Sequence, residues 1–341
     1  MQRVPRRRSA WLALLMGGLA VTQVAHAGAA GDAAAAQRAR AVFVLGEDRE
    51  GAAPFHGPAR LHYLSDAHPR SVLVDTERTL AGVREALGRM TQRGEQPWGE
   101  VVLVAHGSEW LGLAVPLFDA TGSADPETLA LAQTRGEFPP LPDTVIDART
   151  IVRVESCGVG RRADLLELYS TLLGGFDGER PRVLASTELV EFRVLLAGSD
   201  VLHSERLERP YVSRVVKGDA ASGTAVREAM TAELQALGET AGHEAKWLSV
   251  PVSVHLQLPR SQAALLQRRP SRLAQVEEIA VVVRQYGLEA HQLDWSLRCA
   301  SGSADCDVLG RASILSVSAV DMPLPVAGPI GPAGGNAVRA R

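Results

Sequence analysis

Two short stretches, VVLVAHG at residues 101–107 and IVRVESCG at residues 151–158, decide the fold and the candidate site. Each is a run of mostly branched apolar residues that ends in a polar, glycine-containing turn, as buried strands of a parallel sheet do. His106 follows the first run and Cys157 follows the second. In an open α/β sheet, ligands bind outside the carboxyl ends of the strands. We therefore expect the two side chains at one edge of the sheet.

Other segments complete an alternation of strands and helices. Short apolar runs have the composition of buried strands, and apolar residues at helical spacing lie between them. This alternation predicts an α/β domain over residues 41–245, with a mostly parallel sheet flanked by helices. Strands are expected at 41–45, 71–74, 101–104, 151–154 and 182–186, and helices at 75–94, with Asp75–Thr76 as the cap, at 161–175 and at 223–242.

The pattern changes after residue 245. WLSVPVSVHLQLP at residues 247–259 alternates apolar and polar residues, which is typical of antiparallel strands with one solvated face. We expect a small antiparallel β domain over residues 246–322, for which a sandwich is one arrangement. Residues 323–341 are rich in proline and glycine and are expected to be disordered.

The first 27 residues have the pattern of a signal peptide. Four arginines precede an apolar run at residues 10–21, and Ala25-His26-Ala27 fits a signal peptidase site. The run is shorter than the roughly 20 residues that span a bilayer. The pattern predicts export to the periplasm or the medium, with an uncut membrane anchor as the alternative. Residues 28–40 are alanine-rich and are expected to form a flexible leader.

Composition limits the classes of partner. Cleavage after Ala27 leaves 314 residues, enough for two domains, and loss of the four leader arginines changes the formal net charge from −3 to −7. An acidic chain has no electrostatic reason to bind nucleic acid or an anionic membrane. No later segment is long and apolar enough for stable insertion of the mature chain into a membrane.

Three cysteines divide into a pair and a single residue. Cys299 and Cys306 flank a short polar loop, and in an oxidising compartment they are expected to form a disulfide. Cys157 is then left over. It is either a free, reactive thiol or a small buried residue that packs as a hydrophobe.

VVLVAHG and IVRVESCG resemble the paired motifs of the caspase-like cysteine peptidases, which include caspases, gingipains, legumains and clostripains. His106 lies 51 residues before Cys157, close to the caspase spacing, and the resemblance extends over residues 41–191. It implies a peptide or protein substrate and neither metal nor cofactor. It also implies that Cys157 is the nucleophile, that His106 protonates the leaving amine, and that the backbone N–H groups of Gly107 and Cys157 form the oxyanion hole.

The chain departs from the caspase pattern at the cysteine. Glu155-Ser156-Cys157-Gly158 replaces the caspase sequence Q-A-C-R-G, so specificity for aspartate is not implied. Arg161-Arg162, at the start of the next helix, is interpreted as a solvated pair or as a contact for an acidic substrate group. Two alternatives to a peptidase stay open: a non-catalytic caspase-like protein that binds peptides or partners at the envelope, and a redox-sensing thiol protein.

Other polar residues are given structural interpretations. His56-Gly57 repeats the His-Gly pair but has no apolar run before it, so we interpret it as a turn. His62 and His68 lie near Asp66 in the sequence but lack ligand spacing, which favours surface positions over a metal site. Ser108 lacks the strand–turn–helix context of a nucleophilic serine.

Overall fold

The structure is a computed structural model that places most of the chain between residues 35 and 319. The predicted signal peptide, nearly all of the leader and the predicted tail lie outside the described residues. The described residues are 35, 37–48, 54–118, 121–175, 180–197, 200–217, 224–237, 245–268 and 270–319.

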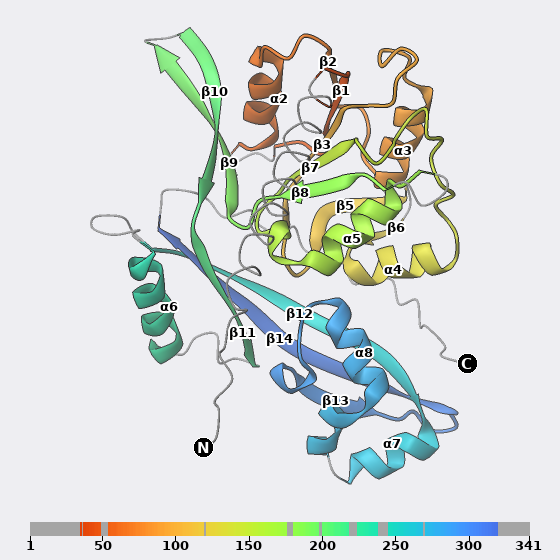
Figure 1. Cartoon of the computed structure of the whole chain (residues 1–341). Coiled ribbons are helices and arrows are strands. Elements are labelled where there is room, and N and C mark those ends of the chain that lie inside the picture. Colours follow the sequence, from red (N-terminus) through yellow and green to blue (C-terminus); the bar gives the residue numbers. More distant parts are fainter. Residues whose placement is uncertain are drawn as a thin grey trace, which may run out of the picture.

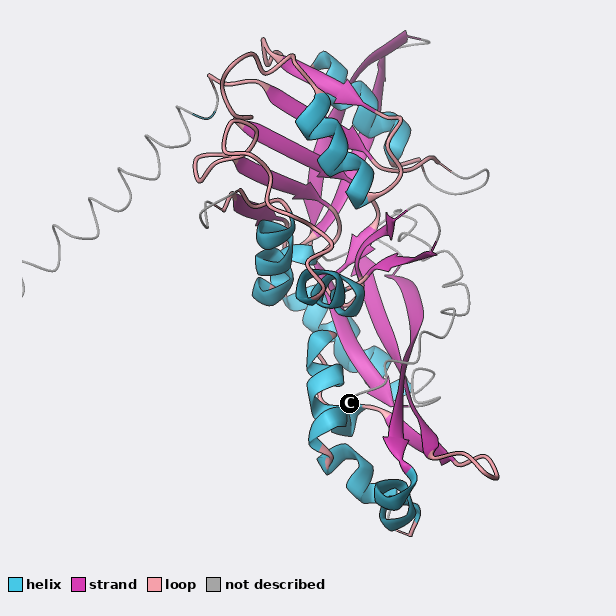
Figure 2. Ribbon diagram, turned by 90° about the vertical axis from the view of Figure 1, so that its right-hand side faces the viewer, coloured by secondary structure: helices cyan, strands magenta, loops and turns pink. Residues whose placement is uncertain are grey.

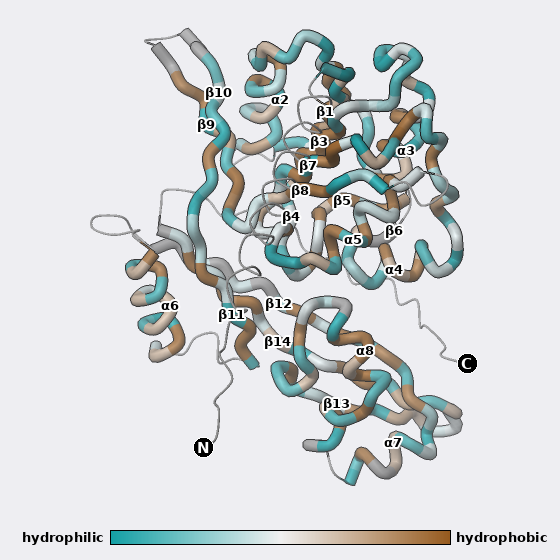
Figure 3. Tube along the Cα trace, in the orientation of Figure 1, coloured by the Kyte–Doolittle hydropathy of each residue, from teal (hydrophilic) through white to brown (hydrophobic). Residues whose placement is uncertain are grey.

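Five parallel strands form the first sheet, in the order β2-β1-β3-β7-β8 (Figure 1). They are the five segments that the apolar runs predict, displaced by at most one residue at either end, so the predicted parallel α/β sheet is confirmed. The tube coloured by hydropathy shows the apolar strands at the centre of this unit (Figure 3). The strands are β1 (Arg40–Val44), β2 (Ser71–Val74), β3 (Glu100–Val104), β7 (Ile151–Glu155) and β8 (Arg182–Ala185).

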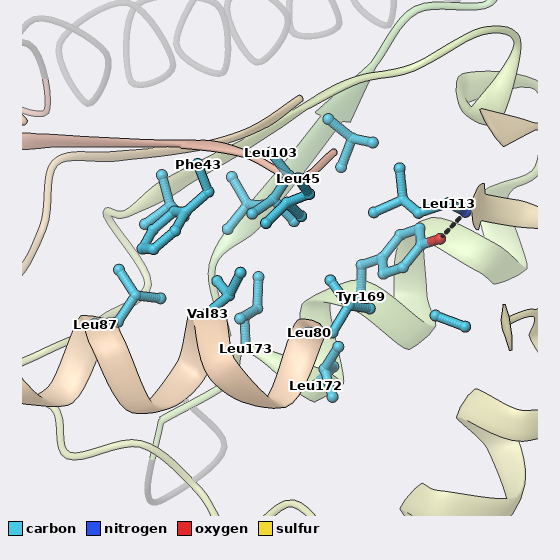
Figure 4. Packing of buried hydrophobic residues seen from close by; sticks show 14 of the residues in the cluster. Phe43, Leu45, Leu80, Val83, Leu87, Leu103, Leu113, Tyr169, Leu172 and Leu173 are labelled. Atoms are coloured by element: carbon cyan, nitrogen blue, oxygen red, sulfur yellow. Dashed lines mark hydrogen bonds between the residues drawn. The ribbon is translucent and has the colours of Figure 1, made fainter. Parts of the chain in front are cut away.

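One face of this sheet carries the larger apolar core. Helices α3 (Leu80–Arg89) and α5 (Ala163–Leu172) pack on it, as the helical spacing predicts. Figure 4 shows Val83 and Leu87 of α3 directed toward Phe43 of the sheet. Burying an apolar side chain of this size contributes about 1.5–3 kcal/mol. The cap of α3 is Thr79, whose hydroxyl accepts a hydrogen bond from the Gly82 amide at 2.9 Å, so the predicted Asp75–Thr76 cap is wrong.

The opposite face is covered by helix α2 (His56–Ser65) and by the start of strand β9 (Leu189–Ala197). The sequence did not predict either element. Side chains alternate along the sheet strands, so residues two apart share a face. The residues packed on this face are Val42, Val44, Phe55, Ala59, Tyr63, Val102, Val104, Val190 and Phe192.

A small three-stranded sheet follows β3. It is composed of β4 (Gly107–Ser108), β5 (Gly112–Phe118) and β6 (Thr121–Ala124), and helix α4 (Pro126–Thr134) comes next. The Tyr169 hydroxyl accepts a hydrogen bond from the Leu113 amide at 2.9 Å, which ties β5 to helix α5 (Figure 4). This sheet lies on the larger core, beside the carboxyl end of β3.

Strands β9 and β10 (Asp200–Arg209) form a hairpin that extends past the parallel sheet (Figure 1). A buried ion pair ties it to the carboxyl end of β7. The Glu155 side chain is 1% exposed and accepts from Arg206 Nε at 2.6 Å. The Tyr63 hydroxyl donates to the other carboxylate oxygen at 3.2 Å. One carboxylate therefore joins the hairpin, helix α2 and the sheet.

The second unit contains a four-stranded antiparallel sheet, in which β14 (Asp305–Ala319) pairs with all three other strands. Even-numbered apolar residues of β14 lie under α7 and α8, and odd-numbered ones lie under α6, so helices cover both faces. Figure 2 shows this unit extending beyond the parallel sheet. Its other elements are β11 (Tyr211–Lys217), α6 (Thr224–Ala236), β12 (Ala245–Pro259), α7 (Arg260–Gln267), α8 (Glu277–Gln285) and β13 (Asp294–Arg298), with short 3₁₀ turns at Pro270–Gln275 and Ala290–Gln292.

The predicted antiparallel region is confirmed, but its limits and layers differ from expectation. The sheet begins at Tyr211, ahead of the expected boundary at residue 245, because β11 pairs with β14 and α6 packs on both strands. Within the described residues, helices rather than a second sheet cover this one, so it is not a sandwich. The valine-rich run before Gly287 is a helix, in which Ile279 and Val283 are buried one turn apart while Val281 is 44% exposed.

The buried pair gives a test of how the hairpin is held. Arg206→Met keeps the length of the side chain but leaves the buried Glu155 carboxylate with Tyr63 as its one side-chain hydrogen-bond donor among the described residues. We expect a loss of about 3 kcal/mol in the free energy of unfolding, measured in urea. Arg214→Met is the control, because the Arg214–Glu233 pair is 49% exposed on each side and is expected to cost less than about 1 kcal/mol. Equal losses in the two variants would contradict the anchoring role.

Candidate functional site

The pairing of β3 with β7 places His106 and Cys157 on the same face of the sheet. Val104 is the register partner of Glu155, and the Ala105 amide continues the pairing to the Glu155 carbonyl at 3.2 Å. His106 comes two residues after Val104, and Cys157 comes two residues after Glu155. Because side chains alternate along a strand, both point to the face that α2 and β9 cover.

Contacts confirm this direction for each side chain. The His106 ring stacks on Phe55, with centroids 4.6 Å apart, and Phe55 in turn contacts Phe192 of β9 at 5.4 Å. The Cys157 thiol donates a hydrogen bond to the Val190 carbonyl, also in β9, with Sγ and O 3.8 Å apart. The predicted imidazole and thiol thus lie on neighbouring strand ends, under the same covering elements.

The thiol is covered. Cys157 is 5% exposed and packs with Leu189 and Tyr211. Burial raises the pKa of the Cys157 thiol to about 11, and the hydrogen bond to Val190 opposes this only in part. In this conformation the sulfur is a protonated, shielded thiol. Of the two interpretations of Cys157 from the sequence, this arrangement agrees with the buried residue.

Tyr211 is held over the thiol by a charged cluster. Its ring lies under the Arg161 guanidinium, 3.8 Å from the ring centroid, and its hydroxyl donates to Glu109 Oε1 at 3.3 Å. Gly158 has a φ of 65°, and a Cβ at this position would collide with the Tyr211 hydroxyl. Glycine at residue 158 therefore permits both the turn after Cys157 and the close approach of Tyr211.

The basic pair after the cysteine binds groups of the protein itself. Arg161 lies 3.8 Å from Glu109 and 3.6 Å from Glu188, and it donates to the Tyr211 carbonyl at 3.0 Å. Arg162 pairs with Asp164 at 2.5 Å. Both arginines are therefore paired within the protein, and the Arg161 side chain is still 27% exposed while that of Arg162 is 11% exposed.

Gly107 lies in β4, where Ser156 Oγ and the Gly112 carbonyl occupy the space that a Cβ would need. Packing thus requires glycine at residue 107. Ser156 is fully buried, and its hydroxyl has no hydrogen-bond partner among the described residues. It lies on the face opposite to Cys157, because the two residues are adjacent in the strand direction.

His56 is the residue near the site that the sequence analysis misinterpreted. His56-Gly57 is not a loop turn but the start of helix α2, and His56 is 3% exposed. Its ring meets the His106 ring edge to face, with centroids 4.9 Å apart. The nearest sequence signal is Pro58, which is tolerated in the first turn of a helix and would have permitted a helix start here.

The remaining polar residues have structural roles. His62 Nδ1 lies 2.9 Å from the Ser204 carbonyl, and Ser108 Oγ accepts from the Leu111 amide at 3.1 Å. His68 and Asp66 are near the surface and belong to separate contacts. Within the described part of the chain, no group of three or more histidine, cysteine, aspartate or glutamate side chains is arranged to hold a metal ion.

The predicted disulfide is present and joins Cys299, which directly follows β13, to Cys306 of β14; Cys157 is the free cysteine. A disulfide agrees with residence in an oxidising compartment. Among the described residues, no helix has both the length and the apolar content to cross a membrane.

No protein-family model, curated protein or solved structure matches the chain. The resemblance to caspase-like peptidases therefore depends on the two motifs, their spacing and the strands that carry them.

Removing the cover should expose the sulfur. In Tyr211→Ala, we expect iodoacetamide to alkylate Cys157 at least about tenfold faster than in the unchanged chain, because the ring no longer excludes the reagent. With Cys299 and Cys306 in a disulfide, mass spectrometry of the intact chain reads Cys157 alone. Tyr211→Phe, which keeps the ring, is the control and should stay slow. Equal rates for alanine and phenylalanine would show that the ring is not the barrier.

The raised pKa also predicts a loss of stability at alkaline pH. The folded chain keeps the Cys157 proton up to about pH 11, whereas an unfolded thiol releases it near pH 9.0. Ionisation of the unfolded thiol therefore lowers the free energy of unfolding as pH rises from 9 to 11, so the contribution of this thiol to stability falls over that range. Tyrosines with raised pKa add a similar loss that all variants share. The difference in Tm between the unchanged chain and Cys157→Ala, followed by calorimetry from pH 8 to 11, should shrink by several degrees. A constant difference would contradict a buried, protonated thiol.

Proposed function

We propose that this chain is an exported cysteine endopeptidase in which Cys157 and His106 form the catalytic pair. One observation carries the proposal: the two residues follow register-paired positions of β3 and β7 and point to the same face of the sheet. A nucleophile and its acid–base partner need this kind of proximity. The motif spacing and the single free cysteine support the same assignment.

The chemistry assigns one role to each group. A Cys157 thiolate attacks the carbonyl carbon of a peptide bond, and the backbone N–H groups of Gly107 and Cys157 stabilise the resulting oxyanion. The His106 imidazolium gives its proton to the leaving amine, which leaves a thioester on Cys157. Water, deprotonated by His106, then attacks the thioester and releases the acid, and Cys157 is restored.

The covering residues make the described conformation a resting one. A thiol with a pKa near 11, bonded to the Val190 carbonyl, is a poor nucleophile at neutral pH. Leu189 and Tyr211 must move before a substrate carbonyl can reach the sulfur. Once the sulfur is solvated beside the His106 imidazole, the thiolate becomes more favourable.

The same burial favours a second candidate function. A buried thiol of raised pKa is the property of a structural cysteine, so the chain would be a non-catalytic protein that binds peptides or partner proteins at the cell envelope. In that case Cys157 and His106 would be packing residues, and neither would affect the chemistry of a bound peptide.

Labelling with a peptidyl electrophile separates the two functions. We expect a mixture of peptidyl chloromethyl ketones of varied sequence to modify Cys157 at neutral pH, fastest in Tyr211→Ala. Replacing His106 by alanine in that background should slow the reaction by about 10² or more. His255→Ala, in the second unit and 48% exposed, is the control and should leave the rate unchanged.

Turnover is read in parallel by cleavage of a degenerate peptide library, with Cys157→Ala as the inactive reference. The proposal is overturned if Cys157 in the uncovered variant reacts no faster than a free thiol, independently of His106, and the library stays intact. Binding of library peptides without cleavage would then support the second candidate.

A further inference from the structure

A second imidazole lies beside His106 and takes no part in the mechanism described above. His56 is 3% exposed, which is unusual for a histidine on the first turn of a helix. Its position is the carboxyl edge of the sheet, where Gly46 follows β1 by two residues and His106 follows β3 by two residues. The contacts around His56 indicate why this side chain is buried there.

Asp48 fixes the first turn of α2. Its Oδ1 accepts from the amides of Phe55 at 2.7 Å and His56 at 2.8 Å, and its Oδ2 accepts from the Gly57 amide at 2.8 Å. Burial alone would raise the pKa of Asp48, but these hydrogen bonds and the nearby His56 lower it overall. The carboxylate is therefore charged at neutral pH. It lies 3.3 Å from His56 Nδ1.

The His56 ring is wedged between Asp48, Gly46 and His106. A Cβ on Gly46 would come within 2.5 Å of His56 Nε2, so the backbone of Gly46 forms one wall. The planes of the His56 and His106 rings are 83° apart, and Phe55 stacks on His106 with its plane at 28°. The ring of His106 thus has an aromatic neighbour on its face and a second imidazole perpendicular to it.

We propose that His56 is a positioning residue for His106. Asp48 anchors His56, and the His56 ring holds the His106 ring against Phe55. Through this contact, His56 couples the electrostatic effect of the Asp48 carboxylate to the His106 ring. The proposal deepens the catalytic role of His106 and rests on the proposed function for its effect on turnover. Its structural part, the coupling of Asp48 to His106 through His56, stands independently of peptidase activity.

The physical effect is on the protonation of His106. A neutral aromatic ring beside an imidazolium stabilises the charge, and a nearby carboxylate does so more strongly. Burial lowers the pKa of His56, and Asp48 opposes this in part, so His56 is neutral at pH 7. Arg60 of α2 and Arg78, which precedes α3, are the cations that face His56, and they act in the same direction as burial. His56 is therefore a neutral ring that contacts both the Asp48 carboxylate and the His106 ring.

A double-mutant cycle measures this coupling. The full chain, labelled with ¹³C-histidine, is titrated by NMR, and the His106 signal is assigned from its loss in His106→Gln. We expect Asp48→Asn, whose amide oxygen still accepts from the helix amides, to lower the pKa of His106 by roughly half a unit or more. In the His56→Phe background, the same change should have less than half that effect.

Controls separate positioning from folding. His62→Phe, on the same helix and bonded to Ser204, should leave the response of His106 to Asp48→Asn unchanged. Thermal unfolding of each variant confirms that the chain is folded, and His56→Gln replaces His56→Phe if the latter does not fold. Additive effects in the cycle, or no response of His106 to Asp48→Asn, would overturn the proposal.

The rate of Cys157 labelling by the peptidyl electrophile, followed from pH 5 to 9, connects the coupling to chemistry. The lower pH limit of labelling should move with the measured pKa of His106 in each variant. If the coupling is present but no variant is labelled or cleaves peptide, the proposed function fails and the positioning contact stands. If peptides are cleaved while the cycle is additive, the proposed function stands and the inference about His56 fails.

Discussion

The parallel pairing of β3 with β7 is the constraint on which the rest of the site depends. Because Val104 and Glu155 are register partners, the residues that follow them leave the sheet side by side. A shift of one residue in this register would send His106 and Cys157 to opposite faces. Buried side chains resist such a shift, because a strand that slipped by one residue would turn its side chains to the opposite face of the sheet. This applies to Val102 and Val104 in β3 and to Glu155 in β7.

The face that holds the two residues is covered by elements with different physical character. Phe55 at the N-cap of α2 and His56 in its first turn lie against His106, and Val190 of β9 lies against Cys157. Both elements are fastened at Glu155, whose carboxylate binds Tyr63 of α2 and Arg206 of the hairpin. The imidazole and the thiol are thus kept in place by one buried charge that lies two residues before Cys157 in the sequence.

The sequence predicted the parts of the fold that local composition controls. The run at residues 101–104 is fully buried and the run at residues 151–154 is half buried, and such strands need only a short block of branched apolar residues to be recognised. The candidate pair follows from the ends of those runs. His56 could not be predicted in the same way, because its burial comes from Asp48 and Gly46, which reach α2 across a loop.

The residues that cover the Cys157 thiol could not be predicted from the sequence pattern either. Residues 190–211 contain charged residues at every few positions, and their strands are stabilised by contacts such as Arg206 with Glu155 and Arg209 with Glu191 rather than by a regular apolar period. Tyr211 was assigned to the first domain by its place in the chain, although its strand pairs with β14. Pairing between distant segments decides such assignments, and no local signal reports it.

Tyr211 joins the state of the thiol to the second unit of the protein. It is the first residue of β11, so its backbone belongs to the antiparallel sheet, while its ring lies on Cys157 and Gly158, which follow β7 of the parallel sheet. Glu109 and Arg161, which contact the Tyr211 side chain, belong to the segments that follow β3 and β7. If the antiparallel sheet moved and carried β11 with it, these contacts would break and the Cys157 sulfur would be exposed at the same time. The second unit is therefore part of the wall of the candidate site, and access to Cys157 depends on how firmly the two sheets are joined at Tyr211.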